Sequence, residues 1–283
     1  MRIFDLHCDT ATVLYDRGLP FDNRETQIRK NLLDGIELTQ CFAVFLNDTL
    51  PHPPGLGYVR NVKKAVFPSL PETVTPLLTV EGAGVLAAED GWIDALRGLN
   101  CRMAGLCWNG ENPLGTGAVK DDSAPLKPAG KEAVCALWDA GIFTDVSHLS
   151  AAGVEDVLSA GDFPIAASHS DSRSVWDHPR NLTDDAAKEI FRRGGAVGLN
   201  LYPPFLGQTA DFAAILRHAD RFLALGGERG LCLGCDLDGV SSLPEGMRDL
   251  SSLSLLYARM KEAFGETLCN AIFYDNAARF FAR

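Results

Sequence analysis

An eightfold alternation of short apolar segments and helical segments is the feature that most constrains the fold of this 283-residue chain. The apolar segments are rich in β-branched and aliphatic residues and end at glycine or polar residues, as strands do. We predict strands at residues 2–4, 36–46, 74–80, 102–107, 143–146, 164–167, 196–201 and 231–234. Near-continuous apolar strands that alternate with helices indicate a parallel sheet buried on both faces. The pattern therefore predicts an α/β fold, a single (β/α)8 TIM-type barrel over residues 1–283.

Helical patterns fill the intervals between these strands. We predict helices at residues 10–17, in a stretch that ends near residue 34, and at 59–67, 92–99, 131–140, 151–159, 183–193, 212–225, 250–264 and 266–282. The alternative fold is an open doubly wound sheet. Its best-known cofactor site needs a Gly-x-Gly-x-x-Gly turn after a strand, and no predicted strand is followed by one.

Charge and composition exclude several classes of partner. The net charge of −11 disfavours nucleic acid and anionic membrane surfaces. No apolar run is long enough for a transmembrane helix, and no basic-then-apolar segment begins the chain, so we expect neither a membrane partner nor a secretory signal. The eight cysteines are scattered and stand mostly beside aliphatic residues, which is typical of reduced cytosolic proteins. These features predict a cytoplasmic protein.

Polar side chains follow six of the predicted strands at the point where each strand ends. They are His7 and Asp9 after the first strand, Glu81 after the third, His148 after the fifth, His169 after the sixth, Tyr202 after the seventh, and Asp236 and Asp238 after the eighth. In a (β/α)8 barrel these strand ends meet at one rim, where the chemistry of such enzymes is located. Three of the six histidines in the chain occupy such positions. The set therefore predicts a metal centre at this rim.

The number of predicted ligands indicates two metal ions. A catalytic zinc ion usually keeps three protein ligands and a water, so five ligands are too many for one ion. His7 and Asp9 would hold one metal, and His148 and His169 the other, with Glu81 between them and a hydroxide shared by both ions. Outside this set we expect Asp5 to be a buried hydrogen-bonding group. His52, in a loop, and His218, in a helix, are expected to face solvent.

Motifs along almost the whole chain resemble the renal (membrane) dipeptidase family of dinuclear zinc peptidases. They are DLHCD, TVEG, DVSH, SHS, DHPRN, GCDLDG and DNAARFF, in this order. The resemblance implies the same ligand set, with Glu81 bridging two Zn²⁺ ions. It also implies that Asp236 handles the proton, that Arg180 anchors the substrate carboxylate, and that Tyr202 lines the pocket. One position departs from the family, because Trp108 stands where members such as the renal enzyme carry a histidine.

These observations predict a dinuclear zinc dipeptidase that uses a metal-bridging hydroxide. A dipeptide is the expected substrate, with Trp108 among the residues that contact it, and the family suggests a homodimer. The alternative is another metal-dependent hydrolase on the same barrel, such as an amidohydrolase or a lactonase. Those enzymes usually carry His-x-His on the first strand and often a carboxylated lysine as the bridge, whereas this chain has His7 and Asp9 on that strand and Glu81 at the bridge position.

Overall fold

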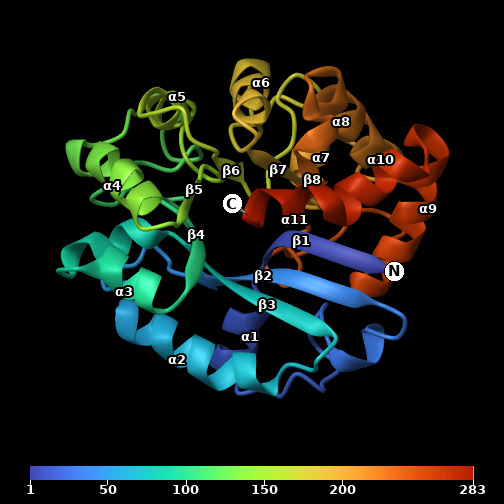
Figure 1. The fold of residues 1–283 in the computed structure, drawn as a ribbon, viewed down its shortest axis with the longest axis horizontal. Coiled ribbons are helices and arrows are strands. Elements are labelled where there is room, and N and C mark those ends of the chain that lie inside the picture. Colours follow the sequence, from blue (N-terminus) through green and yellow to red (C-terminus); the bar gives the residue numbers. More distant parts are fainter. Residues whose placement is uncertain (283) are drawn as a thin grey trace.

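Eight parallel strands close into a barrel in the computed structural model, which describes residues 1–282 (Figure 1). Each strand pairs with its neighbours in chain order, and β1 pairs with β8. The strands are β1 (Arg2–Cys8), β2 (Glu37–Phe45), β3 (Val74–Glu81), β4 (Cys101–Gly105), β5 (Phe143–Asp145), β6 (Ala166–Ala167), β7 (Ala196–Leu199) and β8 (Leu231–Leu233). The predicted (β/α)8 TIM-type barrel is confirmed.

Helices surround the strands (Figure 1). They are α1 (Thr10–Arg17), α2 (Leu56–Val66), α3 (Trp92–Gly98), α4 (Pro128–Asp139), α5 (Ala151–Ser159), α6 (Asp184–Arg192), α7 (Pro203–Leu206), α8 (Phe212–Ala224), α9 (Leu253–Phe264), α10 (Glu266–Asn270) and α11 (Asn276–Phe281). Thr183 and Asp211 cap α6 and α8, because each side-chain oxygen accepts from the backbone N–H three residues later. None of the helices in residues 1–282 combines the length and hydrophobicity that crossing a bilayer requires.

The prediction of a helix that ends near residue 34 is wrong. Only a short 3-10 turn, Lys30–Leu32, forms in that stretch. The side chain of Asn23 accepts from the backbone N–H groups of Glu25 and Thr26 at 2.7 and 2.9 Å. Such a local side-chain turn competes with a helix for the same backbone donors, and here the turn wins.

Phenylalanine side chains close the end of the barrel where the strands begin. The predicted helix over 266–282 is interrupted by a π-helical turn, Ala271–Asp275, after which α11 packs on β1 and β8. Phe281 stacks on Phe4 with ring centroids 5.4 Å apart, and Phe280 lies 4.1 Å from Phe143. Apolar residues from all eight strands complete this cluster (Phe4, Leu6, Cys41, Leu77, Met103, Phe143, Ala166, Ala196 and Cys232). We call this cluster, with Ala277, Phe280 and Phe281 of α11, the apolar plug.

The strands are tightly packed near the opposite end, where they finish. A β-carbon at Gly198 or at Gly234 would collide with the carbonyl oxygen of Ser168. Glycine is therefore required at both positions if β7 and β8 are to pass so close to the residue that precedes His169. The strand predicted at 164–167 is shortened to Ala166–Ala167, because Pro164 has no N–H for the ladder.

Candidate active site

The predicted metal ligands lie together at the end of the barrel where the strands finish. His7 belongs to β1 and Asp9 follows it, Glu81 ends β3, and His148 and His169 follow β5 and β6. All five side chains are buried. His148 has a φ of 70°, as unusual for a non-glycine residue as the φ of 58° at nearby Asp236. Such backbone conformations cluster at functional sites, where the surrounding structure holds them in place.

Glu81 stands between two groups of candidate ligands. Its Oε1 atom lies 2.8 Å from His148 Nε2 and 3.9 Å from His169 Nε2. Its Oε2 atom lies 3.5 Å from His7 Nε2, which is 3.4 Å from Asp9 Oδ2. The two oxygens of one carboxylate thus face different sets of donor atoms, which is the arrangement that a bridging ligand requires.

The donor atoms of these residues suit divalent cations. Nε2 of His7 and Nε2 of His169 are buried and find no hydrogen-bond partner among residues 1–282. A buried imidazole nitrogen without a partner is costly unless a cation or water meets it. A β-carbon at Gly239 would collide with carboxylate oxygens of both Asp9 and Asp236, so the glycine keeps the space beside them open. Imidazole nitrogens and carboxylate oxygens are ligands that zinc accepts.

Burial and crowding shift the protonation of the cluster. Burial lowers the pKa of His7, but the carboxylates around it, chiefly Asp9 and Glu81, outweigh burial and raise the pKa to about 10. Burial raises the pKa of Glu81 well above its usual range. It lowers the pKa of His148 and of His169 well below theirs. Two neutral imidazoles are therefore ready to act as ligands, while protons on His7 and Glu81 would compete with a metal ion.

Outer partners set which nitrogen of two imidazoles faces the cluster. His148 Nδ1 lies 3.0 Å from Asn109 Oδ1, which is a hydrogen-bond acceptor. Nδ1 therefore carries the ring proton, and Nε2 carries none. His169 Nδ1 lies 2.8 Å from Ser168 Oγ, which donates its own proton to Asp145 Oδ2. The hydroxyl must then accept from Nδ1–H, which again leaves Nε2 without a proton. Partners of this kind orient metal-bound histidines.

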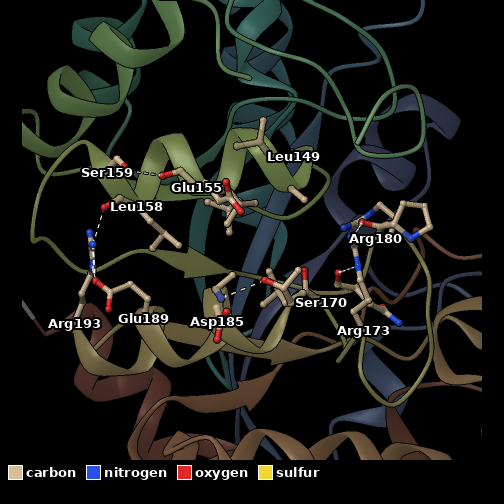
Figure 2. Close-up of a pocket in the computed structure, with 18 residues that line it drawn as sticks. Leu149, Glu155, Leu158, Ser159, Ser170, Arg173, Arg180, Asp185, Glu189 and Arg193 are labelled. Carbon is tan, nitrogen blue, oxygen red and sulfur yellow. Dashed lines mark hydrogen bonds and ion pairs between the residues drawn. The ribbon is translucent and has the colours of Figure 1, made fainter. Parts of the chain in front are cut away.

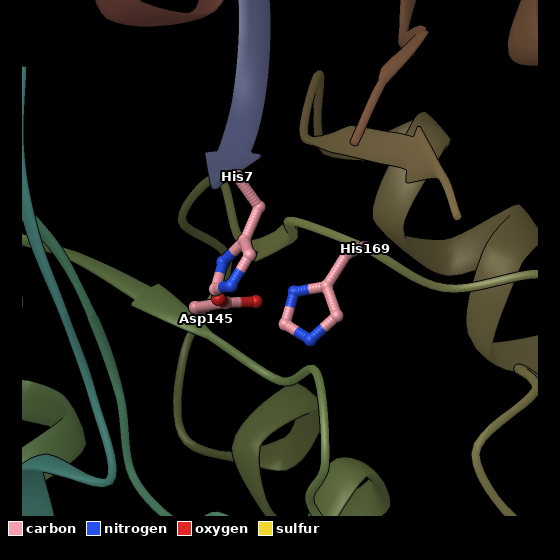
Figure 3. A group of neighbouring side chains, drawn as sticks. All are labelled: His7, Asp145 and His169. Atoms are coloured by element: carbon pink, nitrogen blue, oxygen red, sulfur yellow. The ribbon is translucent and has the colours of Figure 1, made fainter. Parts of the chain in front are cut away.

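The sequence prediction missed Asp145. Figure 3 shows its carboxylate, from the end of β5, close to the imidazoles of His7 and His169. It also accepts from the backbone N–H groups of Ser147 and Ser168 at 3.0 and 2.9 Å. Because its oxygens are engaged in this way, we assign Asp145 to orienting His169. The signal that could have found it is the one used for the other strands, a polar residue at a strand end.

Asp236 and Asp238 differ in what they contact. Asp236 accepts from Asn200 Nδ2 at 3.1 Å through Oδ2, and its Oδ1 lies 3.8 Å from His7 Nε2. Burial raises the pKa of Asp236 to about 7, although the positive charge of His7 opposes the shift. Asp238 accepts from Thr10 Oγ1 and from the backbone N–H of Gln27, both at 2.6 Å. Asp238 therefore fastens the 20–29 loop to the barrel, whereas Asp236 faces the ligand cluster.

A cavity of about 560 Å³ opens above the cluster. The residues predicted to contact substrate, Trp108, Arg180 and Tyr202, all line it. Arg180 is buried, its Nε atom has no partner within residues 1–282, and its guanidinium lies 5.3 Å from the ring of Phe205. Burial lowers the pKa of Arg180 to about 10. Its Nη2 atom donates to the carbonyl oxygen of His169 at 3.4 Å, and the guanidinium keeps further donors for an anion that enters the cavity.

Arg180 also borders a second cavity, of about 430 Å³, between α5 and α6. Figure 2 shows Arg180 and Arg173 at one end of this cavity, and Glu189 and Arg193 at the other. Arg173 donates to the carbonyl oxygen of Asn181 at 3.0 Å, and the backbone N–H of Arg173 donates to the carbonyl of Leu182. These bonds join the two sides of the loop that carries Arg180.

The burial of three residues outside the site was also predicted. Asp5 is buried and accepts from Gln40 Nε2 and from the backbone N–H of Cys235, as predicted. His52 is exposed, as predicted. The prediction for His218 is wrong, because its side chain is fully buried and its Nδ1 accepts from the backbone N–H of Ser172 at 3.0 Å. The buried neighbours in α8 are Ala214, Ile215, Ala219 and Phe222, which place His218 on the inward face of the helix.

Solved structures share this fold. A crystal structure of dipeptidase AC, a metallo peptidase, superposes with a TM-score of 0.84 at 23% identity, covering 100% of this chain and 98% of that one. A metallo peptidase from Rhodobacter sphaeroides, liganded with a phosphinate mimic of the dipeptide L-Ala-D-Ala, gives the same TM-score at 22% identity, covering 100% and 99% of the two chains. At such identities the likeness shows the fold alone.

Sequence comparison identifies the family. An uncharacterized dipeptidase of Schizosaccharomyces pombe is 27% identical over 219 residues, which are 75% of this chain and 54% of the relative. The chain therefore spans about half the length of this relative. The family model described as membrane dipeptidase (peptidase family M19) matches residues 37–283. This match confirms the resemblance seen in the motifs, and the chain belongs to the membrane dipeptidase family, peptidase family M19.

Proposed function

We propose that this chain is a dipeptidase that hydrolyses the peptide bond of dipeptides with two zinc ions. The ions would be held at the mouth of the barrel, which is the end where the strands finish. His7 and Asp9 would hold one ion, His148 and His169 the other, and Glu81 would bridge them. The observation that carries the proposal is the position of Glu81, whose two carboxylate oxygens face the two groups separately. Membership of the dipeptidase family supports the reaction class.

The chain's own residues would position the substrate and move the proton. When bound, two such ions lower the pKa of a shared water and polarise the carbonyl of the scissile bond. Asp236 Oδ1 faces the ligand cluster while Asn200 holds Oδ2, so Oδ1 would accept the proton of the attacking water and deliver it to the leaving amine. Asn109 and Ser168 would keep the Nε2 atoms of His148 and His169 free of protons.

Arg180 would bind the C-terminal carboxylate of the dipeptide. A guanidinium presents a planar fork of donors that matches a carboxylate, and its attraction is strong where water is excluded. Its free Nε atom and its place in the cavity wall support this role. A free carboxylate one residue beyond the scissile bond occurs in dipeptides and not within long chains, so this anchor favours dipeptides.

A dipeptide-library hydrolysis screen with added Zn²⁺ tests the reaction class, and amidated dipeptides test the anchor. Amidation of the C-terminus should cost on the order of 1.5–3 kcal/mol in kcat/KM, the worth of a hydrogen bond to a charged group. Arg180→Ala should reduce turnover of the free acid far more than turnover of the amide. Arg217→Ala, on the exposed face of α8, is the matched control and should leave both rates unchanged.

The same experiment separates the proposal from its alternative. Equal turnover of free-acid and amidated dipeptides by the wild-type protein would contradict the carboxylate anchor. Together with a failure of the library screen, it would favour an amidohydrolase or lactonase that uses the same barrel.

A further inference from the structure

Two aromatic side chains form one wall of the site cavity. Phe45 ends β2 and pairs in register with Glu81 on β3. Register-paired residues of parallel strands point to the same face, so the Phe45 ring lies on the side of the sheet that carries the Glu81 carboxylate. Trp108 follows β4, and its ring meets that of Phe45 edge to face, at 4.9 Å and 71°. Both rings line the cavity and are only partly buried, which leaves their apolar surface open to a ligand. We call this pair the aromatic wall.

The aromatic wall is held in place from behind. The carboxylate of Asp48 accepts from the backbone N–H groups of Trp108 and Gly110, both at 2.8 Å. It also accepts from Asn112 Nδ2 at 3.2 Å, and Asp48 is itself buried. The loop that carries Trp108 is thus fastened at three points. A rigid aromatic surface loses little conformational entropy when a ligand packs on it, so such a surface can contribute strongly to selectivity.

The topology of the barrel decides which end of a dipeptide reaches this wall. In the closed order of eight strands, β2 lies opposite β6. Arg180 is carried by the loop that follows β6 and stands in the cavity wall on that side. A dipeptide whose carboxylate is bound by Arg180, with its peptide bond at the Glu81 cluster, must therefore extend its N-terminal residue toward Phe45 and Trp108.

We propose that Phe45 and Trp108 form the subsite for the side chain of the N-terminal residue, so that the preferred substrates are dipeptides that begin with a large apolar or aromatic residue. This inference rests on the proposed function. It follows from the apolar surface that the two rings present, because burying additional apolar area of the substrate there strengthens binding. Trp108 supplies part of that surface.

Four dipeptides test the inference: Phe-Ala, Leu-Ala, Ala-Ala and Ala-Phe. The wild-type protein should turn over Phe-Ala with a kcat/KM at least about tenfold above that for Ala-Ala, the discrimination that a filled apolar pocket provides. Trp108→Ala and Phe45→Ala should each reduce this ratio by a factor of about 5 to 10. The ratio of Ala-Phe to Ala-Ala should stay unchanged in both variants, because that side chain lies at the other end of the site.

Controls separate a subsite from a general defect. Trp138→Ala removes a tryptophan from the outer surface of α4 and should leave all four rates unchanged. Trp108→Phe keeps an aromatic ring and should retain most of the preference for Phe-Ala. Metal content and thermal unfolding of each variant show whether the site and the fold survive.

The outcomes are distinct for the two proposals. Equal kcat/KM for Phe-Ala and Ala-Ala in the wild-type protein would overturn the inference while leaving the dipeptidase proposal intact. The same holds for a preference that persists in both alanine variants. No hydrolysis of any dipeptide by the metal-loaded protein would overturn both.

Discussion

The two ends of the barrel interior are filled by different kinds of side chain. At the end where the strands begin, the apolar plug fills the interior with rings from α11 and from the strands, such as Phe281 on Phe4. At the end where the strands finish, the interior holds buried carboxylates and imidazoles. Nε2 of His7 and Nε2 of His169 have no hydrogen-bond partner within residues 1–282. The plug is filled by apolar side chains, whereas the opposite end carries buried polar atoms to which residues 1–282 offer no hydrogen bond.

The difference indicates how stability and function are divided in this chain. Apolar packing at the plug stabilises the closed barrel without constraining the chemistry of the mouth. Buried charges at the mouth cost stability, and unusual backbone conformations at His148 and Asp236 add to that cost. Where local backbone preference, packing and hydrogen bonding favour the fold everywhere except at one place, that place is expected to be the functional site. Substitutions at the two ends should therefore have separable effects.

The largest effect is expected at the mouth, from Asp236→Asn. The amide keeps the shape of the side chain but cannot accept and return a proton, so kcat should fall by about 10²- to 10⁴-fold. Metal content and the free energy of unfolding should change little. Steady-state kinetics on a cleaved dipeptide, with elemental analysis of the same sample, measure both. A near-normal kcat with full metal would move the proton-handling role to Asp238 or to solvent.

At the plug, Phe280→Ala should act on stability alone. Removing a buried phenylalanine usually lowers the free energy of unfolding by about 3–5 kcal/mol. Because the plug lies at the opposite end from the ligand cluster, metal content and kcat of the folded variant should match the wild type. Urea unfolding measures the first, and Leu255→Ala, at a side chain that is 43% exposed, should cost less than about 1 kcal/mol. A loss of metal in Phe280→Ala would show that the two ends are coupled.

The buried imidazole of His218 should make the protein sensitive to acid. Burial lowers the pKa of His218 to about 4, below its ordinary value of 6.5. The folded state therefore binds a proton less readily than the unfolded state, and the stability that His218 contributes is present above pH 6.5 and is lost as the pH falls toward 4. The substitution His218→Gln keeps a donor and an acceptor at this position but removes the titrating group, so the variant should not show this loss.

Urea unfolding of wild type and of His218→Gln, from about pH 7.5 to about pH 4.5, measures this contribution. The difference between the two free energies of unfolding should change by about 2.5 kcal/mol over that interval. Other titrating groups affect both proteins alike, so the difference isolates His218. Parallel pH dependences would mean that His218 does not contribute.

A smaller effect is expected from Asn109→Ala, which removes the partner of His148 Nδ1. Losing such an outer partner typically costs about 10- to 100-fold in metal affinity. Competition with a chelator measures the affinity for Zn²⁺ directly, without reference to activity. Asn23→Ala, in the 20–29 loop, is the matched control and should leave the affinity unchanged. An Asn109→Ala protein with wild-type affinity would show that the imidazole is oriented by its backbone alone.

Much of this architecture follows from local sequence patterns. Apolar segments alternate with helices often enough to define eight strands, and the polar residues at the ends of those strands include the five proposed ligands. The outer partners were not predicted, because Asn109, Ser168 and Asp145 are ordinary polar residues of loops and strand ends. Their role depends on contacts between strands that are distant in sequence, such as Ser168 with Asp145.

The errors have physical causes of the same kind. His218 reads as a polar residue of an amphipathic helix, yet it shares the buried face of Ala214, Ile215 and Phe222. The positions of these apolar residues, three and four residues before His218 and four after it, could have predicted that His218 lies on the buried face of the helix. The turn centred on Asn23 competes with helix formation, because its side chain accepts from backbone N–H groups that a helix would use.

The metal content of wild type and of Glu81→Gln tests the central claim of this account most directly. If the two oxygens of Glu81 join two ligand groups, wild-type protein purified with Zn²⁺ should carry two ions per chain. Replacing one oxygen by an amide nitrogen should then weaken both sites at once, so that the variant retains less than one ion after dialysis. One ion or none in active wild-type protein, or a Glu81→Gln variant that still binds two ions, would contradict the bridged arrangement.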